Sequence, residues 1–233
     1  MTTHEIMTQL EAFGNASTKK TLMSHGAREP LFGVKVEDLK KILKKTKKNH
    51  ALSLELYDTG NSDAMYLAAL MADETQLTEA QLEQWVEQAY WFYLNEFAVP
   101  WVAAETPFGF SLGLKWIEST KETTAAAGWG TLASIAALNT DLDVETYSKL
   151  LDRVENEIHN APNRVRYVMN GFLIAIGSAV PELNAKALAI AAKVGSVRVD
   201  MGGTACKVPL ATEYIQKVMD KGGLGKKRKS ARC

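Results

Sequence analysis

A chain of 233 residues, with 46% hydrophobic and 23% charged residues, has the size and composition of one soluble globular domain or an elongated repeat array. Its longest apolar stretch, residues 171–180, is too short to span a bilayer, and two cysteines give no disulfide framework. These features exclude an integral membrane protein and a disulfide-stabilised secreted domain. We therefore expect a cytoplasmic protein with reduced thiols.

Charge is distributed unevenly, although the formal net charge is zero. Ten basic residues lie between positions 19 and 48, and seven lie between positions 217 and 232. Residues 49–114 contain ten acidic residues and no lysine or arginine. Basic ends suit a nucleic-acid partner held at its phosphates, whereas the acidic middle disfavours one unless its carboxylates face away.

Apolar residues recur at helical spacing along nearly the whole chain. The spacing predicts helices over residues 5–13, 36–48, 51–57, 63–71, 78–90, 91–104, 107–117, 122–138, 144–158, 162–177 and 181–194, and a last helix that ends near 221. Thr78 and Gln81 form a capping box, and Pro100 is expected to kink its helix. Residues 197–200 look extended, and Gly202 with Gly203 predicts a turn.

Three helix junctions, which begin at Tyr57, Ile117 and Ile158, resemble one another. Each ends an amphipathic helix in a polar turn and then starts a more buried helix. Repeated helix pairs that cannot bury their apolar faces alone are typical of an α-solenoid. We therefore predict an all-α fold of stacked antiparallel helix pairs. Residues 1–221 would form one solenoid domain, and residues 222–233 a flexible basic tail.

The helix expected to start at Pro162 carries two stripes of different chemistry. An apolar stripe from Val165 to Ile176 predicts the buried side. The other stripe holds amide, guanidinium and phenol groups where a solvated face usually carries Glu and Lys; its members are Asn163, Arg166, Tyr167 and Asn170. Such groups suit phosphate contacts and base stacking, and a solvated helix with an interhelical hydrogen bond or two is the alternative.

Three stretches carry a resemblance to a known family. They are R-E-P-L-F-G-V-K-V-E-D-L-K-K-I-L-K-K from Arg28, L-Y-D-T-G-N-S-D-A-M-Y-L-A-A-L from Leu56, and L-K-W-I-E-S from Leu114. Together, residues 26–177 resemble the DNA alkylation repair family of HEAT-like repeat DNA glycosylases. The resemblance implies a right-handed superhelix whose concave surface holds alkylated or damaged double-stranded DNA. Its active members are hydrolases that excise cationic N3- and N7-alkylated purines without flipping the base into a pocket.

The resemblance also implies a catalytic constellation. Glu96 falls at the family's carboxylate position and Phe92 at its tryptophan position, with Trp91 beside it. The carboxylate would stabilise an oxocarbenium-like state, and the aromatic rings would contact the cationic lesion. The family's arginine position falls near Ala126 or Ala127, so that arginine is missing, and a second tryptophan position matches Phe172.

Other candidate contacts lie further along the chain. Arg164 joins the polar stripe as an expected DNA-backbone contact, and Lys207 beside the turn at Gly202 offers charge to a phosphate. The tail supplies an auxiliary clamp made of Lys226, Lys227, Arg228 and Lys229. Cys206 is expected to be structural, and the four histidines show no metal-ligand spacing, so no metal and no cofactor are expected.

The sequence leaves two functions open. The first is a monomeric DNA-binding protein of the DNA alkylation repair type, with excision of alkylated purines by hydrolysis of the N-glycosidic bond. The second is a noncatalytic helical-repeat scaffold that binds a protein partner or a nonstandard nucleic-acid structure. The missing arginine and the acidic middle favour the second.

Overall fold

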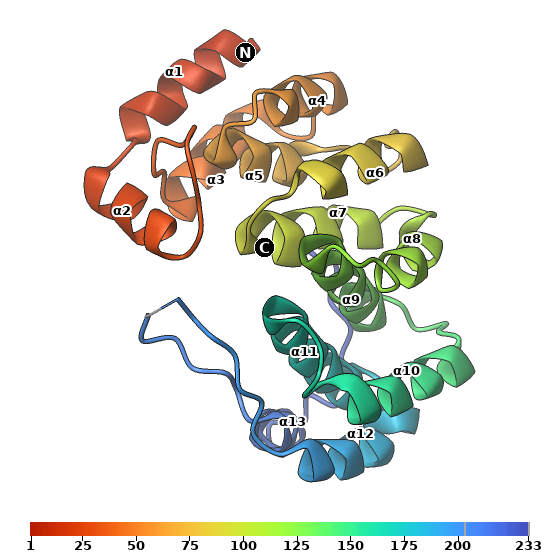
Figure 1. Ribbon diagram of the computed structural model, residues 1–233. Helices are drawn as coiled ribbons and strands as arrows, with labels where there is room; N and C mark the ends of the chain where they lie inside the picture. Colours follow the sequence, from red (N-terminus) through yellow and green to blue (C-terminus); the bar gives the residue numbers. More distant parts are fainter. Residues whose placement is uncertain (203, 233) are drawn as a thin grey trace.

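The computed structural model describes residues 1–202 and 204–232, which form an arc of stacked helices (Figure 1). Within those residues there are thirteen α-helices, one π-helix and no strand. Their bounds are α1 (Thr3–Phe13), α2 (Ala16–Ser24), α3 (Val36–Thr46), α4 (His50–Asp58), α5 (Ser62–Met71), α6 (Glu79–Gln88), η1 (Tyr93–Ala98), α7 (Val99–Ala104), α8 (Gly109–Trp116), α9 (Glu122–Leu138), α10 (Val144–Glu157), α11 (Asn163–Ala179), α12 (Pro181–Val194) and α13 (Ala211–Asp220). The prediction of an all-α solenoid is confirmed. None of these helices combines the length and apolarity that a bilayer crossing requires.

The helices form two rows along the arc (Figure 1). An inner row contains α5, α7, α9, α11 and α13, and an outer row contains α4, α6, α8, α10 and α12. Two apolar clusters fill the space between the rows, and α9 contributes to both: Ala127 to the first, and Ala126 with Trp129 to the second. A β-carbon at Gly128 would lie 2.6 Å from the backbone N of Ile117, so glycine allows α9 to pack closely against the end of α8.

Asp63 joins the two stretches of the first half that carry the family resemblance. Asn61 caps α5, and Asp63 in its first turn is buried. The Asp63 carboxylate accepts hydrogen bonds from the backbone N–H groups of Phe32, Gly33 and Val34, at 2.7 to 3.0 Å. Burial raises the pKa of Asp63, and those donors oppose the rise. The L-F-G-V loop is thus held on the start of α5.

A π-helical turn, rather than a sharp kink, precedes Pro100. The chain stays helical from Tyr93 to Ala104, and the N–H of Val99 donates to the carbonyl of Leu94, five residues back. Proline has no N–H to continue the α-helical ladder, so the helix widens before it. This turn places Asn95 and Glu96 on the inner row, and both are buried.

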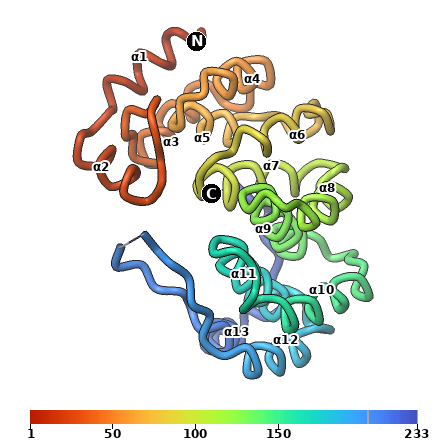
Figure 2. The backbone as a smooth tube through the Cα atoms, viewed as in Figure 1, coloured from red at the N-terminus to blue at the C-terminus, as the bar shows by residue number. Residues whose placement is uncertain are grey.

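The C-terminal residues pack along the solenoid, which differs from the free, flexible tail expected from composition. The backbone N–H groups of Gly225 and Arg228 donate to the carbonyls of Ser178 and Ala137, at the ends of α11 and α9. The chain then reaches α7, where the N–H of Ala231 donates to Glu105 (Figure 2). Cationic side chains near helix C-termini are favourable because those ends carry partial negative charge.

Arg232 holds the end of this segment. Its side chain is 8% exposed and forms ion pairs with Glu74 and Glu105, and its Nη1 donates to the carbonyl of Ala72 at 2.6 Å. The guanidinium therefore ties the C-terminal ends of α5 and α7 together. This contact also neutralises two of the acidic residues in the middle of the sequence. Cys233, the last residue of the predicted tail, lies outside the described residues.

We expect Asp63→Ala to lower the free energy of unfolding by about 3 kcal/mol, because three backbone N–H groups lose their acceptor. Urea unfolding followed by circular dichroism measures this change. Asp58→Ala is the matched control, since Asp58 is exposed and should change stability little. Equal stability of the two variants would contradict the role assigned to Asp63.

Arg232→Ala should lower the free energy of unfolding by about 2 kcal/mol, because the partly buried Glu105 would lose its cationic partner and Glu74 would keep only Lys48. Lys229→Ala, which removes an exposed charge of the same segment, serves as the control. Thermal unfolding of both variants distinguishes a docked segment from a free tail, since a free tail predicts no effect from either change.

Candidate nucleic-acid interface

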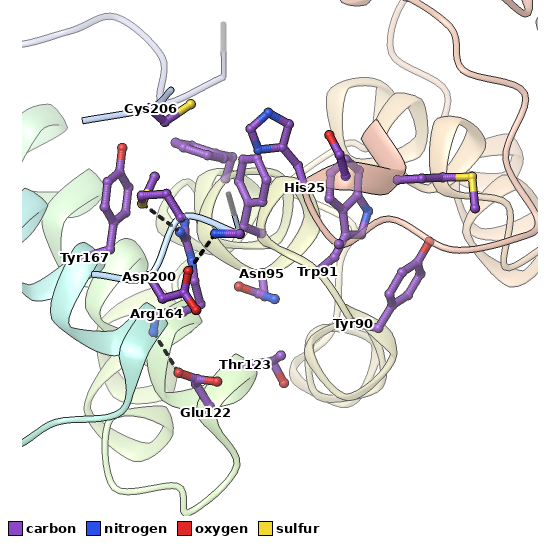
Figure 3. Close-up of a pocket in the computed structure, with 17 residues that line it drawn as sticks. His25, Tyr90, Trp91, Asn95, Glu122, Thr123, Arg164, Tyr167, Asp200 and Cys206 are labelled. Carbon is purple, nitrogen blue, oxygen red and sulfur yellow. Dashed lines mark hydrogen bonds between the residues drawn. The ribbon is translucent and has the colours of Figure 1, made fainter. Parts of the chain in front are cut away.

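A pocket of about 510 Å³ lies on the inner side of the arc (Figure 3). It is enclosed by the end of α2 and the two residues after it, by residues 90–97, by the starts of α9 and α11, and by residues 200–202 and 206. We call it the aromatic pocket, because its lining includes Tyr90, Trp91, Phe92, Phe97 and Tyr167. Phe97 and Tyr167 also border a second hollow of about 250 Å³ that continues along α9 and α11 to Arg228. The two form one inner surface.

A buried ion pair forms the wall between these hollows. Arg164 Nε donates to Glu96 Oε1 at 2.6 Å, and Arg164 Nη2 donates to Glu96 Oε2 at 2.7 Å. The Glu96 side chain is 2% exposed and that of Arg164 is 23% exposed. The rings of Phe92 and Tyr167 lie 5.1 and 4.6 Å from the Arg164 guanidinium carbon. Such a fork-to-fork pair between aromatic faces fixes the side chain in one position.

Burial decides the protonation of Glu96. Loss of solvation raises its pKa to about 7; the hydrogen bonds and charge of Arg164 oppose the rise, and Glu122 adds to it. Glu122 itself is engaged, since its Oε1 accepts from the backbone N of Arg164 at 2.7 Å. Around pH 7 the Glu96 carboxyl group is therefore either protonated or already neutralised by the guanidinium.

The three predicted catalytic residues lie together, but they differ in accessibility. Trp91 is 4% exposed, and its Nε1 donates to Ser62 Oγ at 2.8 Å. Trp91 also stacks on Tyr93, with ring centroids 4.7 Å apart. Phe92 is partly exposed and faces the pocket. Trp91 is therefore mainly a core residue, and Phe92 is the aromatic residue of the two that a ligand could contact.

Arg164 was expected to contact a DNA backbone, but the structure pairs it with Glu96. The positions that match the family's arginine, Ala126 and Ala127, are fully buried, so no side chain there reaches the pocket. An arginine nevertheless meets the carboxylate, and it comes from α11 instead. Phe172 is also fully buried, against Trp129 and Tyr147.

The polar stripe of α11 mostly binds protein backbone, which corrects the expectation of an open binding face. Asn163 exchanges two hydrogen bonds with the backbone of Asp200, at 2.7 and 2.8 Å. Arg166 donates to the carbonyls of Ala161 and Arg198. Asn170 is 1% exposed and donates to the carbonyl of Pro209 at 2.9 Å. These side chains hold the segment between α12 and α13, and Tyr167 alone of the stripe lines the inner surface.

The remaining predicted basic contacts are divided. Lys207 is exposed on the segment that borders the aromatic pocket, and Cys206 beside it is exposed rather than structural. Lys226, Arg228 and Lys229 are also exposed, and Arg228 borders the second hollow. Lys227 is engaged instead, because its Nζ donates to the carbonyl of Ala136 at 2.8 Å. Sequence reasoning missed Arg28, which lies over the ring of Tyr90 at 4.3 Å.

The acidic middle of the sequence contributes one residue to the lining of these two hollows. Glu83 and Glu87 on α6, in the outer row, pair with Lys115 and Lys121. Glu74 and Glu105 pair with Arg232. Of the ten acidic residues between 49 and 114, only Glu96 lines the aromatic pocket or the second hollow. The charge objection to a nucleic-acid partner therefore does not apply to these two hollows.

Glu96→Gln should remove a pH dependence of stability. In the folded state the carboxyl group keeps its proton to about pH 7, whereas the unfolded chain releases it near pH 4.5. The folded state binds more protons in this window, so wild-type stability relative to Glu96→Gln falls by about 3 kcal/mol as pH rises through it. Urea unfolding of both proteins at several pH values measures the difference. Parallel curves would refute the burial effect.

Comparisons with known proteins support the family resemblance and the fold. Residues 6–202 match the sequence model of the DNA alkylation repair enzyme family. Lin0241 of Listeria innocua and Lmo0209 of Listeria monocytogenes, both named as uncharacterized proteins, are each 34% identical over 227 residues, which cover 95% of this chain and 99% of the relative. A solved structure is similar over 100% of both chains, with a TM-score of 0.92 and 37% identity. It is described as a new family of proteins related to the HEAT-like repeat DNA glycosylases with affinity for branched DNA structures. The chain thus belongs to the DNA alkylation repair enzyme family.

Proposed function

We propose that this protein binds branched DNA on its inner surface and does not excise alkylated purines. The observation that carries the proposal is the engagement of Glu96. Both of its oxygens are bonded to Arg164, and its side chain is 2% exposed. A glycosylase needs a carboxylate with uncompensated negative charge beside the sugar. Glu96, the residue predicted to match the family's carboxylate, has no uncompensated negative charge because it is paired with Arg164.

The inner surface suits the close approach of a DNA backbone. Its second hollow is floored by small side chains of α9 and α11, namely Gly130, Ala133, Ser134, Gly171 and Ala175. Arg228 lines the second hollow, and the exposed Arg28 and Lys207 lie next to Tyr90 and Cys206, which line the aromatic pocket. Cations around an uncharged floor favour phosphate contacts that carry no sequence preference.

Two features favour a branched over a linear duplex. The solved relative with affinity for branched DNA is similar over the whole length of this chain. The inner surface also presents partly exposed aromatic side chains, Phe92, Phe97 and Tyr167, at the mouth of a pocket. Aromatic faces stack on unpaired bases, which a linear duplex does not offer and an opened or incompletely paired branch point does.

A labelled four-way junction should bind more tightly than a linear duplex of equal length in a fluorescence anisotropy titration. The double variant Arg28→Ala/Lys207→Ala should bind the junction about ten-fold more weakly, and its log affinity should depend less steeply on log salt, by about two in slope. Lys149→Ala on the outer helix α10 is the control. Equal affinity for junction and duplex would contradict the proposed preference.

Alkylated duplex DNA should release methylated purines no faster with this protein than without it. The reason is that the Arg164 pairing leaves Glu96 unable to stabilise a cationic transition state. Chromatography of released bases, with wild type and Glu96→Gln in parallel, is the measurement. Release by the wild type that disappears in Glu96→Gln would establish a glycosylase and overturn this part of the proposal.

A further inference from the structure

The aromatic pocket contains two buried polar atoms that the fold leaves without a hydrogen bond. Asn95 Oδ1 and Thr123 Oγ1 have no partner among the described residues, and both side chains line this pocket. Asn95 is 3% exposed. In Figure 3 its amide lies between Trp91 and Arg164, and Thr123 lies below it. A buried polar group without a partner is costly, and such groups concentrate where a ligand completes them.

The orientation of the Asn95 amide determines which of its atoms is available to a ligand. Its Nδ2 donates to the carbonyl of Ala89 at 3.4 Å, which turns Oδ1 away as a free acceptor. The hydroxyl of Thr123, on the first turn of α9, can donate or accept. Together they match a ligand edge that carries an N–H donor next to a second polar atom. The edges of nucleobases have this pattern.

The charges of the pocket exclude a phosphate from its depth. Glu122 and Asp200 line it, and the guanidinium of Arg164 is compensated by Glu96. A phosphate beside two carboxylates would be repelled. The aromatic lining and the volume of about 510 Å³ suit a flat, uncharged ring instead. The exposed Arg28 and Lys207 remain outside, where they can hold the phosphates of the same strand.

We propose that the aromatic pocket receives one unpaired nucleobase from the branch point of a DNA junction, with Asn95 and Thr123 bonded to its edge. This inference rests on the proposed function, because it assigns a subsite to the junction. Under this proposal the branch point supplies the unpaired base that enters the pocket. A linear duplex has no unpaired base to insert. The base enters without a covalent step, and stacking on partly exposed rings such as Phe92 holds it.

Thr123→Val is the sharpest test, since valine keeps the shape of threonine and the hydroxyl bonds nothing in the protein. Thr124→Val is the matched control. The Thr124 hydroxyl is also buried and without a partner among the described residues, but Thr124 does not line the pocket. Neither substitution should destabilise the fold, which thermal unfolding verifies. Any loss of binding is then attributable to the pocket.

The ligand is a junction with one unpaired adenine at its branch point, compared with the same junction carrying an abasic site there. We expect wild type to prefer the unpaired base. Thr123→Val should bind that junction about five-fold more weakly and the abasic junction unchanged, and Thr124→Val should match wild type on both. With 2-aminopurine in place of the adenine, bound wild type should shield the base from an added quencher.

The outcomes separate the two proposals. If wild type binds both junctions equally, and Thr123→Val behaves like wild type, the base pocket is refuted while junction binding stands. If wild type binds no junction more tightly than a linear duplex, the proposed function fails and the pocket proposal fails with it. A preference for the unpaired base that Thr123→Val loses and Thr124→Val keeps supports both.

Discussion

The ion pair between Arg164 and Glu96 is the contact on which the inner surface depends. It joins the π-turn of the first half to the start of α11 in the second half, across 68 residues of sequence. The same Arg164 backbone N–H is held by Glu122 at the start of α9. Three inner-row segments are therefore fixed at one point, and the aromatic side chains around that point are placed by it.

A second set of contacts fixes the other edge of the arc. The C-terminal segment runs past the ends of α11, α9 and α5, and Arg232 closes it on Glu74 and Glu105. Repeat proteins are stabilised mainly by contacts between neighbouring helix pairs. A C-terminal segment that contacts several helix pairs therefore limits how far the arc can open. The C-terminal segment reaches the inner surface, because its Arg228 borders the second hollow next to the aromatic pocket. The inner surface is thus held by contacts on both sides.

The surroundings of Glu96 show how the partners of a carboxylate set its charge. A carboxylate kept at that place is not sufficient for excision, because its charge depends on its partners. Here desolvation and a bidentate arginine remove the free charge that the chemistry requires. The aromatic residues and surrounding cations remain available for binding. Under the proposed function, this chain keeps the DNA-binding surface and lacks the group that would break a glycosidic bond.

The sequence by itself determined the all-α class, the order of most helices and the capping box at Thr78, because helical periodicity and capping are local properties. It missed α2, whose only buried side chain is Leu22, so that no apolar stripe marks it. It brought Trp91, Phe92 and Glu96 to attention through resemblance, but not the partner of Glu96. Only the tertiary structure decided that Arg164 neutralises Glu96, that Asn163, Arg166 and Asn170 face protein backbone, and that the basic C-terminal residues are docked. These facts depend on contacts between residues dozens of positions apart, and neither periodicity nor composition carries information about such contacts.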